Sequence, residues 1–201
     1  MGKLEPQIIL SLASLKPADI ILTTTDHYES LSIRLATGGP VSHSMLFLGS
    51  AGGASATVAE AVGSGSREAP IGTALVGATV AIVLRRREIT AAQASEVVSR
   101  ARTLIMPSRP YDTLGAVGAG MTVGNCVAVG VVICAPLYGS VLLNSRPSRR
   151  DLRFFCSELV ARAFQMAGVP IIDEEPSFAN PYEVLQSKHL RYAGNLQVRA
   201  S

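Results

Sequence analysis

The sequence has no tryptophan, few aromatic residues (5%) and few charged residues (16%). Nucleic-acid-binding proteins usually combine a concentrated basic stripe with aromatic side chains on which bases stack. The net charge of +3 is only a mild excess, compatible with an anionic substrate. We therefore expect no nucleic-acid partner.

Cysteine is also scarce, with three residues and no CxxC pair. An odd count without paired spacing predicts neither a disulfide framework nor a zinc site. Motifs of the HExxH, Walker, GxGxxG and GxSxG types are absent, so we expect no metal and no organic cofactor. The N-terminal stretch is interrupted by Glu5 and Pro6, and we identify no secretory signal in it. The sequence does not determine the cellular location of the protein.

At 201 residues and a mean hydropathy of +0.32, the chain is long and apolar enough to bury a core. We expect a single domain over 1–201. Alternating or continuous apolar runs predict strands, and helical periodicity predicts helices. The predicted strands cover 19–24, 41–48, 57–62 and 79–86, and the predicted helices 29–37, 90–106, 156–167 and 181–187, before a terminal extended piece.

The stretch 113–145 contains no charged residue. It is long enough to cross a bilayer, since about 20 apolar residues suffice. Recurrent glycines, with Asn125 and Pro136, dilute its hydrophobicity. We expect an apolar insertion of close-packed helices that covers the core or the substrate cleft. The alternative is a membrane or lipid contact through this stretch.

Cys156 follows two phenylalanines at the point where a helical pattern begins. A thiol at a helix start lies near unpaired backbone N–H groups and the positive end of the helix dipole, which favour the thiolate. The alternative is a small buried hydrophobic residue, the usual fate of a free cysteine.

His43 lies among apolar residues of a predicted strand, where many histidines are merely core residues. The strands 41–48 and 57–62 flank a Gly/Ala/Ser loop and predict a hairpin. A turn centred near 51–52 would place His43 directly opposite Glu60, close enough for the carboxylate to orient the imidazole. Asp19 is the next candidate for that role. A thiol, a base and an orienting carboxylate form an activated nucleophile.

Several segments together resemble the circularly permuted papain-like hydrolases of the NlpC type, a branch that includes relatives of lecithin retinol acyltransferase. The segments are PADIILT, GGPVSHSMLFLG, TVAEAV, the Tyr111-Asp112 pair, FFCSELVARAF and NPYEVLQS. The histidine precedes the cysteine, as in the permuted branch. The uncharged stretch 113–145 is longer and more apolar than this resemblance leads us to expect.

The resemblance implies an α+β permuted papain-like fold in which a small antiparallel sheet packs against the helix that starts at the nucleophilic cysteine. It implies Cys156 as nucleophile, His43 as base and Glu60 as third member. Tyr111 is carried over as a pocket or oxyanion-side residue that contacts substrate.

The implied reaction is hydrolysis of an amide bond, and by analogy the substrate is a peptidoglycan stem peptide. Peptidoglycan lies outside the cytoplasm, so delivery as an antibacterial toxin by a dedicated secretion machine, with an immunity protein as partner, is our hypothesis. One alternative is a lipid acyl hydrolase or acyltransferase that uses the same three residues. The other is a non-catalytic binding module of the same fold.

Overall fold

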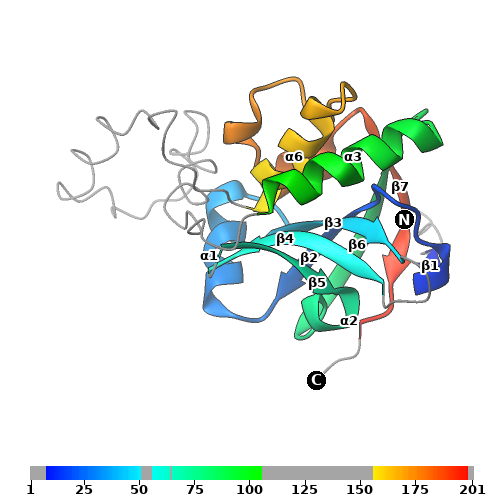
Figure 1. Cartoon of the computed structure of the whole chain (residues 1–201). Coiled ribbons are helices and arrows are strands. Elements are labelled where there is room, and N and C mark those ends of the chain that lie inside the picture. The colour runs from blue at the N-terminus through cyan, green and yellow to red at the C-terminus, as the bar shows by residue number, and fades with distance from the viewer. Residues whose placement is uncertain (1–7, 51–55, 64, 106–155, 199–201) are drawn as a thin grey trace, which may run out of the picture.

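The computed structural model describes residues 8–50, 56–63, 65–105 and 156–198. Within these residues the fold is a mixed α+β arrangement built on one seven-stranded sheet. Figure 1 shows this sheet with the helices packed around it. The strands are β1 (Ile9–Leu10), β2 (Ile20–Thr25), β3 (His43–Gly49), β4 (Thr57–Val62), β5 (Gly65–Pro70), β6 (Ala78–Arg86) and β7 (Leu190–Leu196). The helices are α1 (Tyr28–Thr37), α2 (Ile71–Ala74), α3 (Ala91–Leu104), α6 (Cys156–Met166) and α7 (Pro181–Gln186), with 3-10 turns at Leu12–Ser14 and Pro176–Phe178.

The strand order is β1-β7-β6-β2-β3-β4-β5. All neighbouring pairs are antiparallel except β1 and β7, which run parallel. The two strands that carry the expected site, β3 and β4, are therefore neighbours, and β2 lies on the other side of β3.

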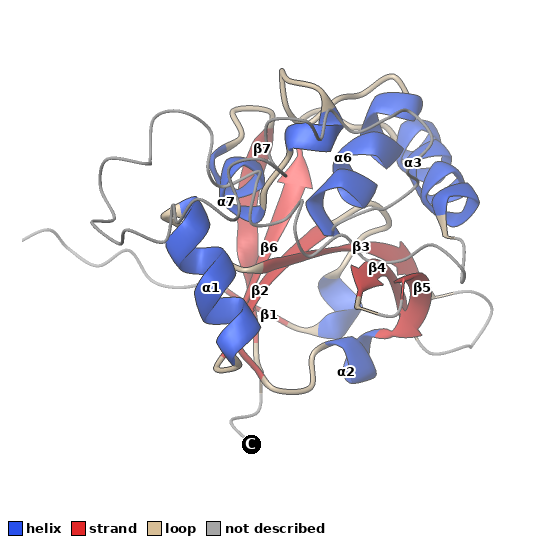
Figure 2. Ribbon diagram, turned by 90° about the vertical axis from the view of Figure 1, so that its left-hand side faces the viewer, coloured by secondary structure: helices blue, strands red, loops and turns tan. Residues whose placement is uncertain are grey.

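Helices cover both faces of the sheet (Figures 1 and 2). On one face, α3 and α6 pack on β3 and on each other and bury Leu46, Val97 and Phe164. On the other face, Met45 joins a second cluster with Ile71 of α2. Successive residues of a strand point to opposite faces, so the continuous apolar run of β3 is buried on both sides.

Local sequence determines where the two main helices begin or end. Thr90 accepts a hydrogen bond from Gln93 N–H, and the Gln93 side chain accepts one from Thr90 N–H, so a capping box begins α3. The amphipathic α6 buries Leu159 and Phe164 completely. It is followed by Gly168, whose φ of 73° belongs to the left-handed region that ends many helices.

The mixed α+β class is confirmed, whereas the sheet is larger than the small one that we expected. Residues 65–70 and 71–74, for which we predicted neither strand nor helix, form the edge strand β5 and the helix α2. α2 is short, and β5 contains Gly, Glu and Pro, which strands usually disfavour. Strand pairing with β4 overrides that local preference.

The insertion 113–145 and Tyr111 lie outside the described residues. Among the residues that are described, we find no helix of the length and apolar character needed to span a bilayer.

Candidate active site

His43 and Glu60 are brought together by β3 and β4, in a register that differs from the expected one. Leu46 pairs with Ala59 and Phe47 with Val58, with a register shift before Gly49. Carried one residue further, this register places Glu60 opposite Met45 rather than opposite His43. His43 is thus a diagonal neighbour of Glu60 on the same sheet face, a separation that long side chains can bridge.

The expected hydrogen bond nevertheless forms, because the carboxylate reaches along the strand. His43 donates through Nε2 to Oε2 of Glu60 at 3.1 Å. Nδ1 is then the ring nitrogen left for the thiol. The side chain of His43 is 22% exposed, and that of Glu60 is 3% exposed.

Arg67 of β5 binds the other oxygen of the same carboxylate. Its Nε and Nη2 donate to Oε1 of Glu60 at 2.9 and 2.8 Å. The two residues face each other in the β4–β5 register. Burial alone raises the pKa of Glu60, but His43 and Arg67 outweigh burial, and the pKa lies below its ordinary value. The carboxylate therefore stays ionised while almost fully buried.

Sequence reasoning did not identify Arg67, because no strand was predicted between residues 62 and 79. The available signal was the short Gly63-Ser64 connection after β4. A two-residue connection between strands is typical of a hairpin, and the pairing of Val62 with Gly65 places Arg67 opposite Glu60.

Cys156 is the first residue of α6, and its side chain interacts with that of His43. Burial raises the pKa of the thiol, but the charge and hydrogen bond of His43, with further hydrogen bonds from Ser44, lower it to about 7. Conversely, burial lowers the pKa of His43, but Cys156 and Glu60 outweigh burial and raise it to about 10. The two groups titrate as a pair. Between these values the favoured form is a thiolate beside an imidazolium.

Buried hydroxyl groups surround this pair. Ser44 donates to Ser157 Oγ at 3.2 Å, and Ser157 Oγ lies 3.9 Å from the sulfur of Cys156. Ser30 and Ser42 share a 2.6 Å hydrogen bond nearby in the fold. These serines were not singled out from sequence, because small polar residues that flank a histidine have many ordinary roles. Their hydrogen bonds help to hold the beginnings of β3 and α6 together.

A cavity of about 460 Å³ opens beside the histidine. His43, Glu60 and Arg67 line it, together with threonines of β2 and the first residues of α1. Cys156 is not a lining residue and is only 2% exposed.

Asp19, the alternative third member, does not take that role. Arg85 Nε and Nη2 donate to its two oxygens at 2.6 and 2.7 Å. Asp19 precedes Ile20, which pairs with Leu46, whereas His43 pairs with Thr23 further along β2. Asp19 and His43 therefore lie toward opposite ends of these strands.

Comparison with known proteins shows a distant likeness. No protein-family model matches the chain. The chain is 23% identical to the probable lipoprotein peptidase YaeF of Escherichia coli (strain K12), over 94% of this chain and 73% of that protein. A crystal structure of the metalloprotein yiiX from Escherichia coli O157:H7 matches with a TM-score of 0.61 at 18% identity, covering 89% of this chain and 96% of that chain.

The likeness to yiiX shows a shared fold. The word metalloprotein describes that protein, and the described part of this chain contains no group of three or more His, Cys, Asp or Glu residues placed to hold a metal ion. The described residues therefore do not fit a metal centre.

Proposed function

We propose that this protein is a cysteine hydrolase that transfers an acyl group from an amide or ester to water through Cys156. The observation that carries the proposal is a row of alternating charges at the end of β3. Arg67 binds Glu60, Glu60 binds His43, and His43 interacts with the Cys156 thiol. Glu60 and Cys156 are almost fully buried within this row, and burying charge is costly even when it is paired. We therefore favour an enzyme over a non-catalytic module.

In the proposed reaction the thiolate attacks the carbonyl carbon and forms a C–S bond. Backbone N–H groups at the start of α6 stabilise the resulting oxyanion. The imidazolium of His43 then protonates the leaving nitrogen or oxygen as its bond to carbon breaks, which leaves a thioester on Cys156. Neutral His43 next removes a proton from water, which attacks the thioester. The acid is released, and the thiolate and imidazolium are restored.

Glu60 and Arg67 have positioning roles in this scheme. Glu60 holds the imidazole through Nε2 and favours its charged form, as the carboxylate does in other triads. Arg67 fixes the second oxygen of Glu60, so the carboxylate cannot rotate without losing two charge-assisted hydrogen bonds.

The substrate that we propose is an amide bond in peptidoglycan stem peptides, cleaved by a permuted papain-like enzyme. The support is the sequence resemblance, the chain order in which His43 precedes Cys156, and the distant relative named as a probable peptidase. Export as a toxin by a secretion machine, with a cognate immunity protein, remains part of this hypothesis.

Mass spectrometry of purified muropeptides tests this substrate. We expect new stem-peptide fragments after incubation with the protein, and intact muropeptides after incubation with the Cys156→Ala variant. The Cys126→Ala variant is the matched control and should cleave like the unmodified protein. Equal cleavage by the Cys156→Ala variant would refute the proposed nucleophile.

A lipid acyl ester is the second candidate substrate, and the exposed side chains of α1 favour it. Tyr28, Leu31 and Leu35 are 81%, 43% and 59% exposed and lie at helical spacing on one side of α1. Tyr28 and the exposed Val76 also line the cavity that contains His43. An acyl chain that leaves this cavity would meet an apolar surface.

Esters of p-nitrophenol with increasing chain length separate the two candidates. For a lipid hydrolase, kcat/KM should rise with chain length, and the Leu35→Ser variant should lose that rise while keeping its rate on the acetate ester. A rate that does not depend on chain length would contradict the lipid candidate.

A further inference from the structure

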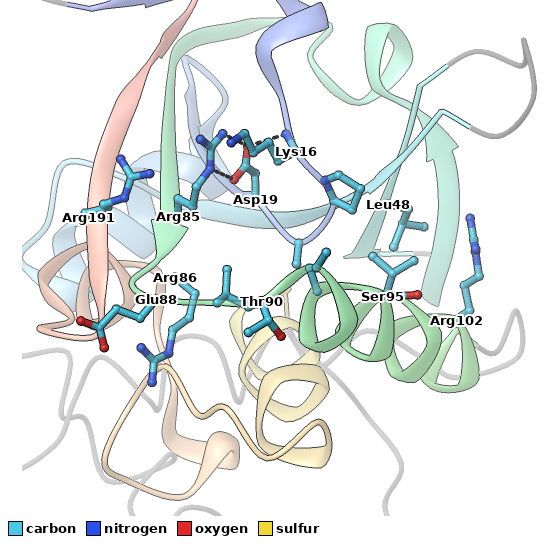
Figure 3. A pocket seen from close by; sticks show the side chains of 16 residues that line it. Lys16, Asp19, Leu48, Arg85, Arg86, Glu88, Thr90, Ser95, Arg102 and Arg191 are labelled. Atoms are coloured by element: carbon cyan, nitrogen blue, oxygen red, sulfur yellow. Dashed lines mark hydrogen bonds and ion pairs between the residues drawn. The ribbon is translucent and has the colours of Figure 1, made fainter.

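A second cavity, of about 590 Å³, lies at the other end of the sheet (Figure 3). Its wall on the sheet side includes Arg85 and Arg86 of β6 and Arg191 of β7, and its helical wall includes Ala94 and Val98 of α3. The mechanism proposed above uses none of these residues. The volume is in the range of pockets that bind small molecules.

The lining of this cavity has an excess of basic residues, although Arg85 and Arg102 are paired with Asp19 and Glu68. Five lining residues are Lys or Arg, and only two, Asp19 and Glu88, are acidic. Asp19 is already bound by both Nε and Nη2 of Arg85. Within the described residues, neither Lys16 nor Arg191 forms an ion pair, and both are exposed.

Two of the arginines are placed against each other. Arg85 and Arg191 are direct partners in the antiparallel β6–β7 register. Like charges in directly opposed positions destabilise a sheet. Arg86 donates to the carbonyl oxygens of Pro170 and Arg87, which are neutral and leave its charge uncompensated. Asp19 compensates the charge of Arg85, so the charges left for an anion are those of Arg191 and Arg86.

The backbone at the cavity supplies an independent sign of a specialised site. Ala18 and Glu88 have φ values of 67° and 55°, and they are the two non-glycine residues with positive φ in the described part of the chain. Both line this cavity. Such conformations are disfavoured for residues with a side chain, and they are concentrated at ligand-binding and catalytic sites.

We propose that this cavity binds a small organic anion with a carboxylate or phosphate head and an apolar body. The head contacts Arg191 and Lys16, and the apolar body lies along Ala94 and Val98 of α3. No aromatic side chain is among the described lining residues, which argues against a stacked nucleobase. The site is separate from the candidate active site, because Asp19 and His43 lie toward opposite ends of β2 and β3.

Calorimetric titration of the full chain tests this proposal with n-octyl phosphate and n-octanoate as probes. Inorganic phosphate tests the head alone, and octyl glucoside tests the apolar body without charge. We expect one molecule of an amphipathic anion to bind per chain, more tightly than either partial probe and more weakly as salt increases. The head group that binds more tightly distinguishes a phosphate ligand from a carboxylate one.

Two variants test the location. The Lys16→Gln/Arg191→Gln variant should bind the better probe at least about ten-fold more weakly, equivalent to about 1.4 kcal/mol. Ser95→Trp, at an exposed lining position, should block the cavity without removing charge. Arg100→Gln removes a charge from α3 outside the lining and should bind normally.

Cys156→Ala should also bind normally, so failure of the proposed hydrolase would leave this result unaffected. Absence of binding of both amphipathic anions at millimolar concentration would overturn the proposal. Equal binding by the unmodified protein and both cavity variants would overturn it too.

Discussion

Removal of the imidazole should raise the pKa of the Cys156 thiol. With His43 present, that pKa is about 7, because the charge and hydrogen bond of the imidazolium outweigh burial. In the His43→Ala variant burial acts without this opposition. The thiol should then titrate above about 8.5, the value of a free cysteine.

The expected shift is at least about 1.5 pH units, equivalent to about 2 kcal/mol of lost thiolate stabilisation. At pH 7 the ionised fraction would fall from about half to a few per cent. A more basic thiolate is intrinsically more nucleophilic, with a Brønsted coefficient of about 0.4 to 0.5, so the alkylation rate at a single pH changes by only a few-fold. The midpoint of the pH dependence is therefore the informative quantity.

Alkylation by iodoacetamide across a pH series, followed by mass spectrometry of the peptide that contains Cys156, measures that midpoint. Reading only this peptide removes the contributions of the other two cysteines. His189→Ala is the matched control, since His189 is bonded to Asp173 and does not contact the thiol. A midpoint in His43→Ala that stays within about half a unit of the unmodified protein would refute the reasoning.

Further expectations concern activity and stability. Cys156→Ala and His43→Ala should each abolish hydrolysis, and the variant that carries both substitutions should be no less active than either one. Glu60→Gln should retain a reduced rate of hydrolysis. Undiminished activity in Glu60→Gln would contradict the positioning role of Glu60. The rate should rise with pH through about 7 as the thiol ionises and fall toward about 10 as the imidazolium loses its proton. A rate that rises only near pH 8.5, about the pKa of an ordinary thiol, would contradict the ion pair. Arg67→Gln should lower the free energy of unfolding in urea by about 1 to 2 kcal/mol, less than for a fully buried pair because the arginine side chain is 48% exposed. Arg100→Gln, which breaks the exposed pair with Glu96, should lower the free energy of unfolding by less than about 0.5 kcal/mol. Equal losses of stability in Arg67→Gln and Arg100→Gln would contradict the reasoning.

Local patterns in the sequence were sufficient for most elements of the fold. The apolar residues of β3 are continuous and those of α6 recur at helical spacing. Each of these local patterns indicates which faces of the element are buried. The position of Cys156 at the change from an apolar dipeptide to a helical pattern placed it at a helix start, as observed. The bond between His43 and Glu60 was expected from hairpin geometry, although the register was wrong by two positions.

What only the tertiary structure decided was how distant elements pair. Arg67 contributes to the candidate site because β5 joins the edge of the sheet, although its composition disfavours a strand. Arg85 and Arg191 oppose each other because β7, from the far end of the chain, pairs with β6. The periodicity of apolar residues shows which side of one helix or strand is buried. It does not show which distant strand pairs with that strand. The charge row at one end of the sheet and the basic cavity at the other are therefore consequences of strand order and register.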